Sequence, residues 1–231
     1  MHSGVPLFDD WLAGVRDGGL HLLTGGPGSG KSTVALEFAD AGLRRGEPVA
    51  MLVHARAADV LSHAQYIGVE LRKPLRDGRL LLLRYRPDFL ERASHAGAPD
   101  DVITDLERLV LSHRPRRIVV DTFSPLVSVG PPVVGAATAL AHLLERTKTA
   151  SLLTFPEELA EGYDRSLEPI VQNATVVIRL VREDADVRRA ELLSARAPSP
   201  EAATKRFVIR EGRGVVSDPA VRAERLTLRA P

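Results

Sequence analysis

The run from Gly25 to Ser32 is the stretch of the chain whose residue types and spacing are best suited to chemistry. It reads GGPGSGKS and fits the pattern G-x-x-x-x-G-K-[ST]. Its glycines let the backbone wrap closely around an anion, and consecutive backbone N–H groups form a nest for phosphate oxygens. A chance match in a chain of this length is expected on the order of one time in a hundred. The run therefore predicts a phosphate-binding loop.

The side chains of this loop have separate expected roles. Lys31 supplies a cation for the terminal phosphates, and the Ser32 hydroxyl is placed to ligate Mg²⁺. A helix starting near Lys31 would add the positive end of its dipole. The alternative is an ordinary glycine-rich turn, which the rarity of the match and the apolar run before it argue against. The residues that we expect to bind nucleotide here are Gly26, Pro27, Gly28, Ser29, Gly30, Lys31, Ser32 and Thr33.

A second candidate metal ligand follows an apolar run later in the chain. The segment RIVVD ends at Asp121, and a carboxylate at a strand end beside a phosphate loop can hold the water shell of Mg²⁺. Many buried strands end in Asp, so Asp121 is a candidate metal ligand only because the chain also has a phosphate loop. Thr122 follows, so there is no acidic pair. The expected metal ligands are Ser32 and Asp121.

The composition excludes several classes of protein. The 231 residues include 31 Lys and Arg against 30 Asp and Glu, and no Cys, so there is no disulfide framework, thiol nucleophile or cysteine zinc site. The net charge of +1 and the 4% aromatic content argue against nucleic-acid binding. The sequence shows no signal peptide and no membrane-spanning run, which predicts a cytoplasmic protein. The basic spots, which we expect to be solvated, are Arg44–Arg45, Arg114, Arg116, Arg117 and Arg188–Arg189.

Short apolar runs alternate with helical patterns along most of the chain. This alternation predicts an α/β fold whose sheet is mostly parallel, and ligands of such sheets bind outside the carboxyl ends of the strands. Three later runs predict an antiparallel C-terminal extension. No linker divides the chain, so we expect one domain over residues 1–231. The expected strands are 20–24, 48–53, 80–83, 118–120, 151–155, 175–181, 189–194 and 206–209, and the expected helices are 32–45, 58–68, 100–113 and 134–148.

With these motifs in place, nearly the whole sequence resembles the KaiC-like ATPases of the RecA superfamily. The opening SGVPLFDDWLAGVRDGGLHLLTGGPGSGKST, the segment Gly46–Val49, the helix Asp59–Gly68, the strand end Val120–Thr122 and the ending RFVIREGRGVV all resemble family segments. The resemblance implies a three-layer α/β/α core of RecA type and binding of ATP with Mg²⁺. It also implies ring-like homo-oligomers, such as hexamers, with nucleotide between neighbouring subunits.

Two departures from the family pattern bear on activity. Relatives carry two glutamates directly after the second strand, one of which orients the attacking water as general base. The matching positions are His54 and Ala55. Alanine can neither accept a proton nor orient water. A histidine can act as a base in principle, although a polar residue at a strand end is the favoured interpretation of His54.

The second departure lies in the C-terminal hairpin. Relatives present K-x-R there to the γ-phosphate of the neighbouring subunit, and the matching stretch is Ser194-Ala195-Arg196. The lysine is lost, and Arg196 remains as a candidate nucleotide-binding residue that acts in trans. The alternative is a solvated arginine at a strand end.

Removing a group that positions water costs about 10²-fold or more in rate, whereas the binding residues are intact. The sequence therefore predicts an ATP-binding switch or assembly module with weak or lost ATP hydrolysis and an unidentified protein partner. Two alternatives stay open: an active Mg²⁺-dependent ATPase with a non-standard base, and a recombinase-like ATPase that assembles on DNA. Thr154 is a candidate phosphate sensor, and Glu157–Glu158 are interpreted as first-turn acids of a short helix.

Overall fold

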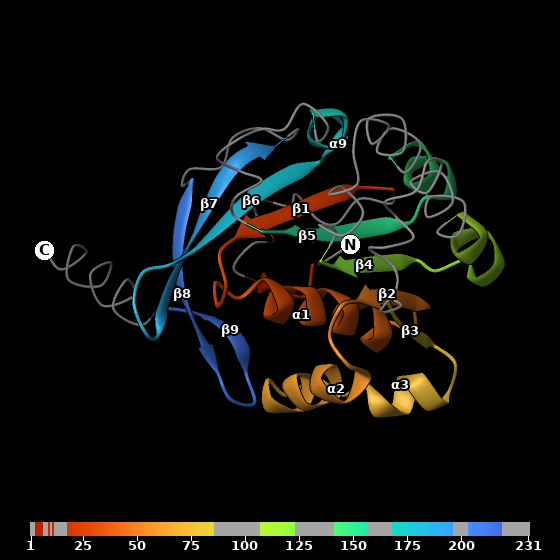
Figure 1. The fold of residues 1–231 in the computed structure, drawn as a ribbon, viewed down its shortest axis with the longest axis horizontal. Coiled ribbons are helices and arrows are strands. Elements are labelled where there is room, and N and C mark those ends of the chain that lie inside the picture. Colours follow the sequence, from red (N-terminus) through yellow and green to blue (C-terminus); the bar gives the residue numbers. More distant parts are fainter. Residues whose placement is uncertain are drawn as a thin grey trace, which may run out of the picture.

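The computed structural model describes residues 3–6, 9, 11, 18–85, 107–122, 141–156, 168–195 and 203–218. These residues form one nine-stranded sheet (Figure 1). From edge to edge, its strands are β3 (Leu80–Arg84), β2 (Val49–Val53), β4 (Arg117–Asp121), β5 (Ala150–Phe155), β1 (Leu20–Gly25), β6 (Val176–Arg182), β7 (Val187–Ala195), β8 (Thr204–Arg210) and β9 (Gly214–Ser217). The helices are α1 (Lys31–Arg44), α2 (Ala57–Tyr66), α3 (Arg72–Arg76), α9 (Glu168–Asn173), and the segments 107–113 and 141–147.

The predicted parallel sheet is confirmed. Strands β1 to β6 pair in parallel, and all of their carboxyl ends therefore meet at one edge. Successive side chains of a buried strand point to opposite faces, which divides the core in two. In β4, Val119 belongs to the cluster under α1 and α2, whereas Ile118 and Val120 belong to the cluster that includes Leu144 of segment 141–147. The sheet thus lies between helices on both of its faces, which is the predicted three-layer α/β/α arrangement.

The predicted antiparallel extension is also present, with one strand more than expected. Strands β7, β8 and β9 continue the sheet in antiparallel pairing beyond β6. The sequence did not predict β9, because its four residues are too few to show a periodicity. The short helices α3 and α9 were missed for the same reason. Of the predicted helices 100–113 and 134–148, the parts 107–113 and 141–147 are described and helical.

The hairpin of β8 and β9 is hydrogen-bonded to α1 and α2, near the loop that follows β1. The Val215 N–H donates to Oε1 of Glu37 on α1 at 2.6 Å, and the Gly212 N–H donates to the Tyr66 carbonyl at the end of α2 at 2.7 Å. Burial raises the pKa of Glu37 to about 8, against the opposing effect of the Val215 bond. The carboxyl of Glu37 is thus protonated near neutral pH, and the extension is held by a neutral hydrogen-bonded group.

One basic spot is placed differently from the sequence prediction. Arg117 was expected on a solvated surface, but its side chain is fully buried. Its Nε donates to Glu47 at 2.8 Å, its Nη1 donates to the Phe38 carbonyl at 3.0 Å, and its guanidinium lies over the Phe38 ring. The prediction was wrong because charge alone does not reveal a partner 70 residues away. Among the described residues, no helix is long and apolar enough to cross a membrane.

Candidate functional site

The loop between β1 and α1 has a backbone that only glycine can adopt at its two ends. Gly25 has φ 150°, and a Cβ there would lie 2.2 Å from the Leu180 carbonyl oxygen of β6. Gly30 has φ 102° in the left-handed region and immediately precedes α1. Side chains at these positions would force the loop away from the sheet or out of its curve. The predicted role of the glycines is consistent with this geometry.

The start of α1 is electrostatically suited to an anion. The first N–H groups of a helix have no partner within it, and here no side chain caps them. The first turn of α1 contains no acidic residue, so nothing opposes the positive end of the helix dipole. The hydroxyl of Ser29 is buried and has no hydrogen-bond partner among the described residues. The loop thus combines N–H donors with a buried hydroxyl that can accept or donate a further bond.

Lys31 folds back over the loop that precedes it. Its ammonium donates to the carbonyl oxygens of Gly25 at 2.6 Å and Gly26 at 2.9 Å. These contacts place a positive charge on the concave side of the loop. An ammonium bonds more strongly to an ionised oxygen than to a neutral carbonyl, so phosphate oxygens can compete for it.

A pocket of about 440 Å³ opens over the loop, and its size suits a small-molecule ligand. It is lined by Gly28, Ser29, Gly30, Lys31, Ser32, Thr33, His63, Tyr66, Asp186, Arg188 and Ile209. Six of these residues, 28–33, were predicted from the sequence to bind nucleotide. His63 and Tyr66 of α2, Asp186 of the β6–β7 hairpin and Ile209 of β8 were not among the predicted residues, and Arg188 of the hairpin was expected to be solvated. Their positions in the chain gave no signal, because only the packing of α2 and the extension brings them to the loop.

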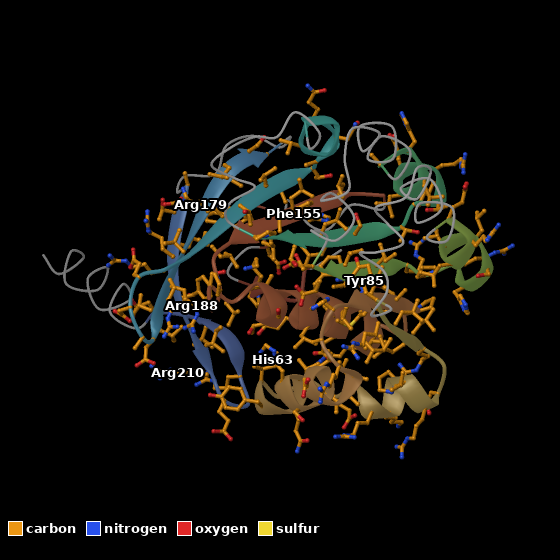
Figure 2. All side chains as sticks on the ribbon, viewed as in Figure 1. His63, Tyr85, Phe155, Arg179, Arg188 and Arg210 are labelled. Atoms are coloured by element: carbon orange, nitrogen blue, oxygen red, sulfur yellow. The ribbon has the colours of Figure 1, made fainter. Side chains whose placement is uncertain are left out.

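His63 of α2 contacts the first turn of α1 through Thr33. Its Nε2 lies 3.1 Å from the Thr33 hydroxyl, and Figure 2 shows the ring between α1 and α2. Burial lowers the pKa of His63, and the negative charge of Asp121 opposes this effect. His63 is therefore a neutral hydrogen-bond partner that fixes the Thr33 hydroxyl.

Asp121 lies at the predicted edge, at the end of β4. The β2–β4 register places it opposite Val53, and Oδ1 accepts a bond of 2.6 Å from the Thr154 hydroxyl at the end of β5. Asp121 is not among the residues that line the pocket over the loop. Thr154, the candidate phosphate sensor, is fully buried and is bonded to this carboxylate. In this bond Oδ1 is the acceptor, so the second carboxylate oxygen of Asp121, Oδ2, takes no part in it.

The donor set is compatible with Mg²⁺, which prefers oxygen ligands and keeps several waters. Ser32 lines the pocket, and both Ser32 and Asp121 are half-buried. Among the described residues, no group of three or more His, Cys, Asp or Glu could form an all-protein metal site. This pattern suits a cation that arrives with phosphate and water ligands.

The end of β2 carries no carboxylate. His54 and Ala55 follow β2 directly and are both exposed. The His54 N–H donates to the Asp121 carbonyl at 3.0 Å, which continues the β2–β4 ladder to the edge where Asp121 lies. The His54 side chain does not line the pocket. The backbone of His54 thus lies beside Asp121, and neither His54 nor Ala55 is an acid.

Three further predicted residues lie outside the described part of the chain: Arg196, Glu157 and Glu158. The strand that precedes Arg196 in the chain, β7, is described as far as Ala195. β7 ends at Ala195, which pairs with Val176 at the start of β6, and Val176 in turn pairs with His21 near the start of β1. β7 therefore ends at the edge of the sheet opposite the phosphate loop of the same chain.

A glycine-rich loop between a parallel strand and a helix, with its lysine and hydroxyl in place and an acid at a strand end in the same sheet, defines a P-loop nucleotide-binding protein of RecA type. The model of the family described as "ATPase: KaiC" matches residues 1–220, and the chain belongs to this family.

Known relatives agree with this assignment. The chain is 28% identical to a UPF0273 protein of Methanopyrus kandleri over 58% of this chain and 57% of that protein. It is 28% identical to a UPF0273 protein of Aeropyrum pernix over 70% of this chain and 69% of that one. It is 24% identical to the circadian clock protein KaiC3 of a Synechocystis strain over 95% of this chain, but the match spans only 45% of KaiC3.

Solved structures support the fold. The KaiC-like protein of Pyrococcus horikoshii superposes with a TM-score of 0.74 at 22% identity, over 95% of this chain and 98% of that one. The flagellar accessory protein FlaH of Methanocaldococcus jannaschii superposes with a TM-score of 0.73 at 18% identity, over 91% and 94% of the two chains. At these identities the likeness concerns the α/β fold with its antiparallel extension.

Proposed function

We propose that this protein binds ATP with Mg²⁺ and hydrolyses it slowly or not at all, so that it works as a nucleotide-dependent switch or assembly module. The observation that carries the proposal is a contrast at one edge of the sheet. The loop after β1 keeps its lysine and hydroxyl, whereas the end of β2 carries His54 and Ala55 in place of an acid.

Binding would rest on the loop and the start of α1. Backbone N–H groups of the loop and the ammonium of Lys31 would hold the phosphate chain, since the charge, donors and curvature converge there. Ser32 and Asp121 would hold Mg²⁺, which neutralises part of the phosphate charge when bound. The ring of Tyr66, 51% exposed at the rim, and the half-buried Ile209 offer apolar surface for the nucleoside.

Slow hydrolysis follows from the missing base. Orienting and deprotonating the attacking water is worth about 10²–10⁴-fold in rate. A nucleotide that binds one conformation better still shifts the balance between conformations without being cleaved. The β8–β9 hairpin, which contacts both α1 and α2, could transmit such a change.

The proposal includes one domain and assembly into a homo-oligomeric ring with nucleotide between neighbours. Its support is the family membership and the direction of β7, which ends away from the phosphate loop of its own chain. A cation following Ala195 would therefore serve a neighbouring subunit.

The test measures two quantities on the same purified protein: the dissociation constant of Mg·ATP, and the rate of phosphate release. We expect binding that Lys31→Ala weakens by about 10-fold or more, the loss of a charge-assisted contact, and turnover well below one per second. Lys73→Ala, which removes an exposed lysine of α3, is the matched control and should bind ATP as the wild type does. Absence of ATP binding would overturn the proposal, and turnover near one per second would overturn the part on slow hydrolysis.

A further inference from the structure

The β6–β7 hairpin lies against the phosphate loop of its own chain. The Nε of Arg188, the second residue of β7, donates to the Gly28 carbonyl at 3.1 Å. A Cβ on Gly28 would lie 3.1 Å from Nη1 of Arg182, and a Cβ on Gly30 would lie 3.5 Å from Cδ of Arg188. Two arginines of the hairpin therefore pack on Gly28 and Gly30 of the loop. Figure 2 shows Arg188 between the hairpin and α1.

The turn of the hairpin fixes where Arg188 stands. Oδ1 of Asp184 accepts bonds of 2.8 Å from the N–H groups of both Asp186 and Val187, which closes the turn. The guanidinium of Arg188 then donates from Nη1 to the Asp186 carbonyl at 2.8 Å. The side chain is thus held at both its Nε and one Nη, while the residue lines the pocket beside Lys31.

Neither arginine is neutralised by a salt bridge within the described part of the chain. Arg182 donates to the carbonyls of Asp184 at 2.9 Å and Ala185 at 3.3 Å, and Arg188 donates to the carbonyls of Gly28 and Asp186. Partial burial and then the charge of Arg182 lower the pKa of Arg188, with Asp186 and Asp184 opposing. Two neighbouring cations beside an anion nest are a costly arrangement that a bound anion would relieve.

We propose that Arg188 is an anion-binding residue of the phosphate pocket that acts in cis, on the nucleotide held by the loop of its own chain. This inference rests on the proposed ATP binding and goes beyond it. Arg188 is the second residue of β7, at the edge of the sheet where the phosphate loop lies, and β7 ends with Ala195 at the opposite edge. Arg188, near the first end of β7, therefore serves the chain's own site. This assignment does not depend on the segment that follows Ala195.

The test compares two substitutions of Arg188 in the full-length protein by calorimetric titration with Mg·ATP, Mg·ADP and adenosine. Arg188→Gln removes the charge but keeps an N–H donor for Gly28, and should weaken binding of both nucleotides about 10- to 100-fold, as expected for a charge-assisted contact. Arg188→Lys keeps the charge and should retain most of the affinity. Binding of adenosine, which has no phosphate, should be unchanged by either substitution.

Arg206→Gln is the matched control. Arg206 lies on β8, is 53% exposed in its side chain, pairs with Glu183 and does not line the pocket, so its loss should leave affinity unchanged. Equal nucleotide affinity of wild type and Arg188→Gln would overturn the inference. Equal losses in the Lys and Gln variants would also overturn it, because the charge that Lys keeps and Gln removes would then not account for the loss. If the wild type fails to bind ATP at all, the proposed function itself falls.

A mixing experiment tests the cis assignment separately. Arg188→Gln protein keeps an intact loop, and Lys31→Ala protein keeps Arg188. If Arg188 acted on a neighbouring subunit, mixed assemblies would regain tight sites. We expect the mixture to bind Mg·ATP no better than the average of the two variants, and recovery of affinity on mixing would overturn the cis assignment.

Discussion

The carboxyl ends of β1 and β2 lie at the same edge of one sheet, yet they differ in what they keep. After β1, the loop has its glycines, its lysine and a helix start without acids. After β2, His54 continues the β2–β4 ladder with its backbone, and Ala55 has no functional group. In the proposed function, the groups that bind nucleotide and the position for a base therefore follow different strands, with β4 and β5 between them. A sequence can lose one and keep the other without disturbing the fold.

The largest expected effect comes from returning a carboxylate to the end of β2. Ala55 is exposed and follows the strand that pairs with β4 up to Asp121, so Ala55→Glu should be accommodated. We expect phosphate release to rise about 10²-fold or more, with unchanged ATP affinity, because a base acts on water in the transition state. Steady-state phosphate release and nucleotide titration measure both quantities.

Ala58→Glu is the matched control, since it adds the same charge at an exposed position in the first turn of α2. It should leave turnover at the wild-type level. An Ala55→Glu protein that still fails to release phosphate would mean that the end of β2 is not what limits hydrolysis.

The next effect concerns the support behind the loop. Below about pH 4.5 the Glu37 carboxyl is protonated in the folded and unfolded chain alike. As the pH rises toward about 8, the unfolded chain ionises while the folded carboxyl stays protonated, so the protein loses stability over this window and the loss levels off above it. The loss amounts to a few kcal/mol, at about 1.4 kcal/mol per unit of pKa shift.

Glu37→Gln should remove this slope, because its amide oxygen can still accept the bond from Val215 and does not titrate. Urea unfolding at pH 5 and pH 8 measures the difference, with the exposed Glu211→Gln as control. Parallel pH profiles of wild type and Glu37→Gln would contradict a buried neutral carboxyl. ATP affinity near neutral pH should be the same in both proteins.

A smaller effect is expected at the contact of α2 with the first turn of α1. His63→Ala removes the partner of the Thr33 hydroxyl and should weaken Mg·ATP binding about fivefold, the value of one neutral hydrogen bond. Thr33→Ala should cost a similar amount, and the double variant little more than either single one, since the two share the interaction. Losses that add in full would show that His63 acts on the nucleotide independently of Thr33.

For the last substitution, His54→Ala, we expect no effect. His54→Ala alters an exposed side chain that does not line the pocket, so binding and phosphate release should both stay at the wild-type level. Nucleotide titration and steady-state phosphate release measure both quantities. Turnover near one per second in the wild type that collapses in His54→Ala would instead favour the active ATPase with a histidine base.

Local patterns predicted much of the molecule. The strands from Leu20 and Ala150 and the helix from Lys31 were found to within one or two residues, since long buried strands and an amphipathic helix carry their own periodicity. The loop between Gly25 and Ser32 was equally visible, because its chemistry lies in consecutive residues. The four-residue strand β9 was not, since its conformation depends on pairing with β8 and on Glu37 of α1.

The sequence by itself determined the phosphate loop, the parallel order of alternating strands and helices, and the absence of an acid after β2. Only the tertiary structure decided which other side chains reach that loop. Arg188 lies 160 residues from Gly28 along the chain, and His63 lies 30 residues from Thr33. It likewise decided that Arg117 is buried against Glu47. The physical reason is that the types and spacing of consecutive residues are enough to predict a loop built from neighbours. Contacts between residues far apart in the chain form only once the sheet has been assembled.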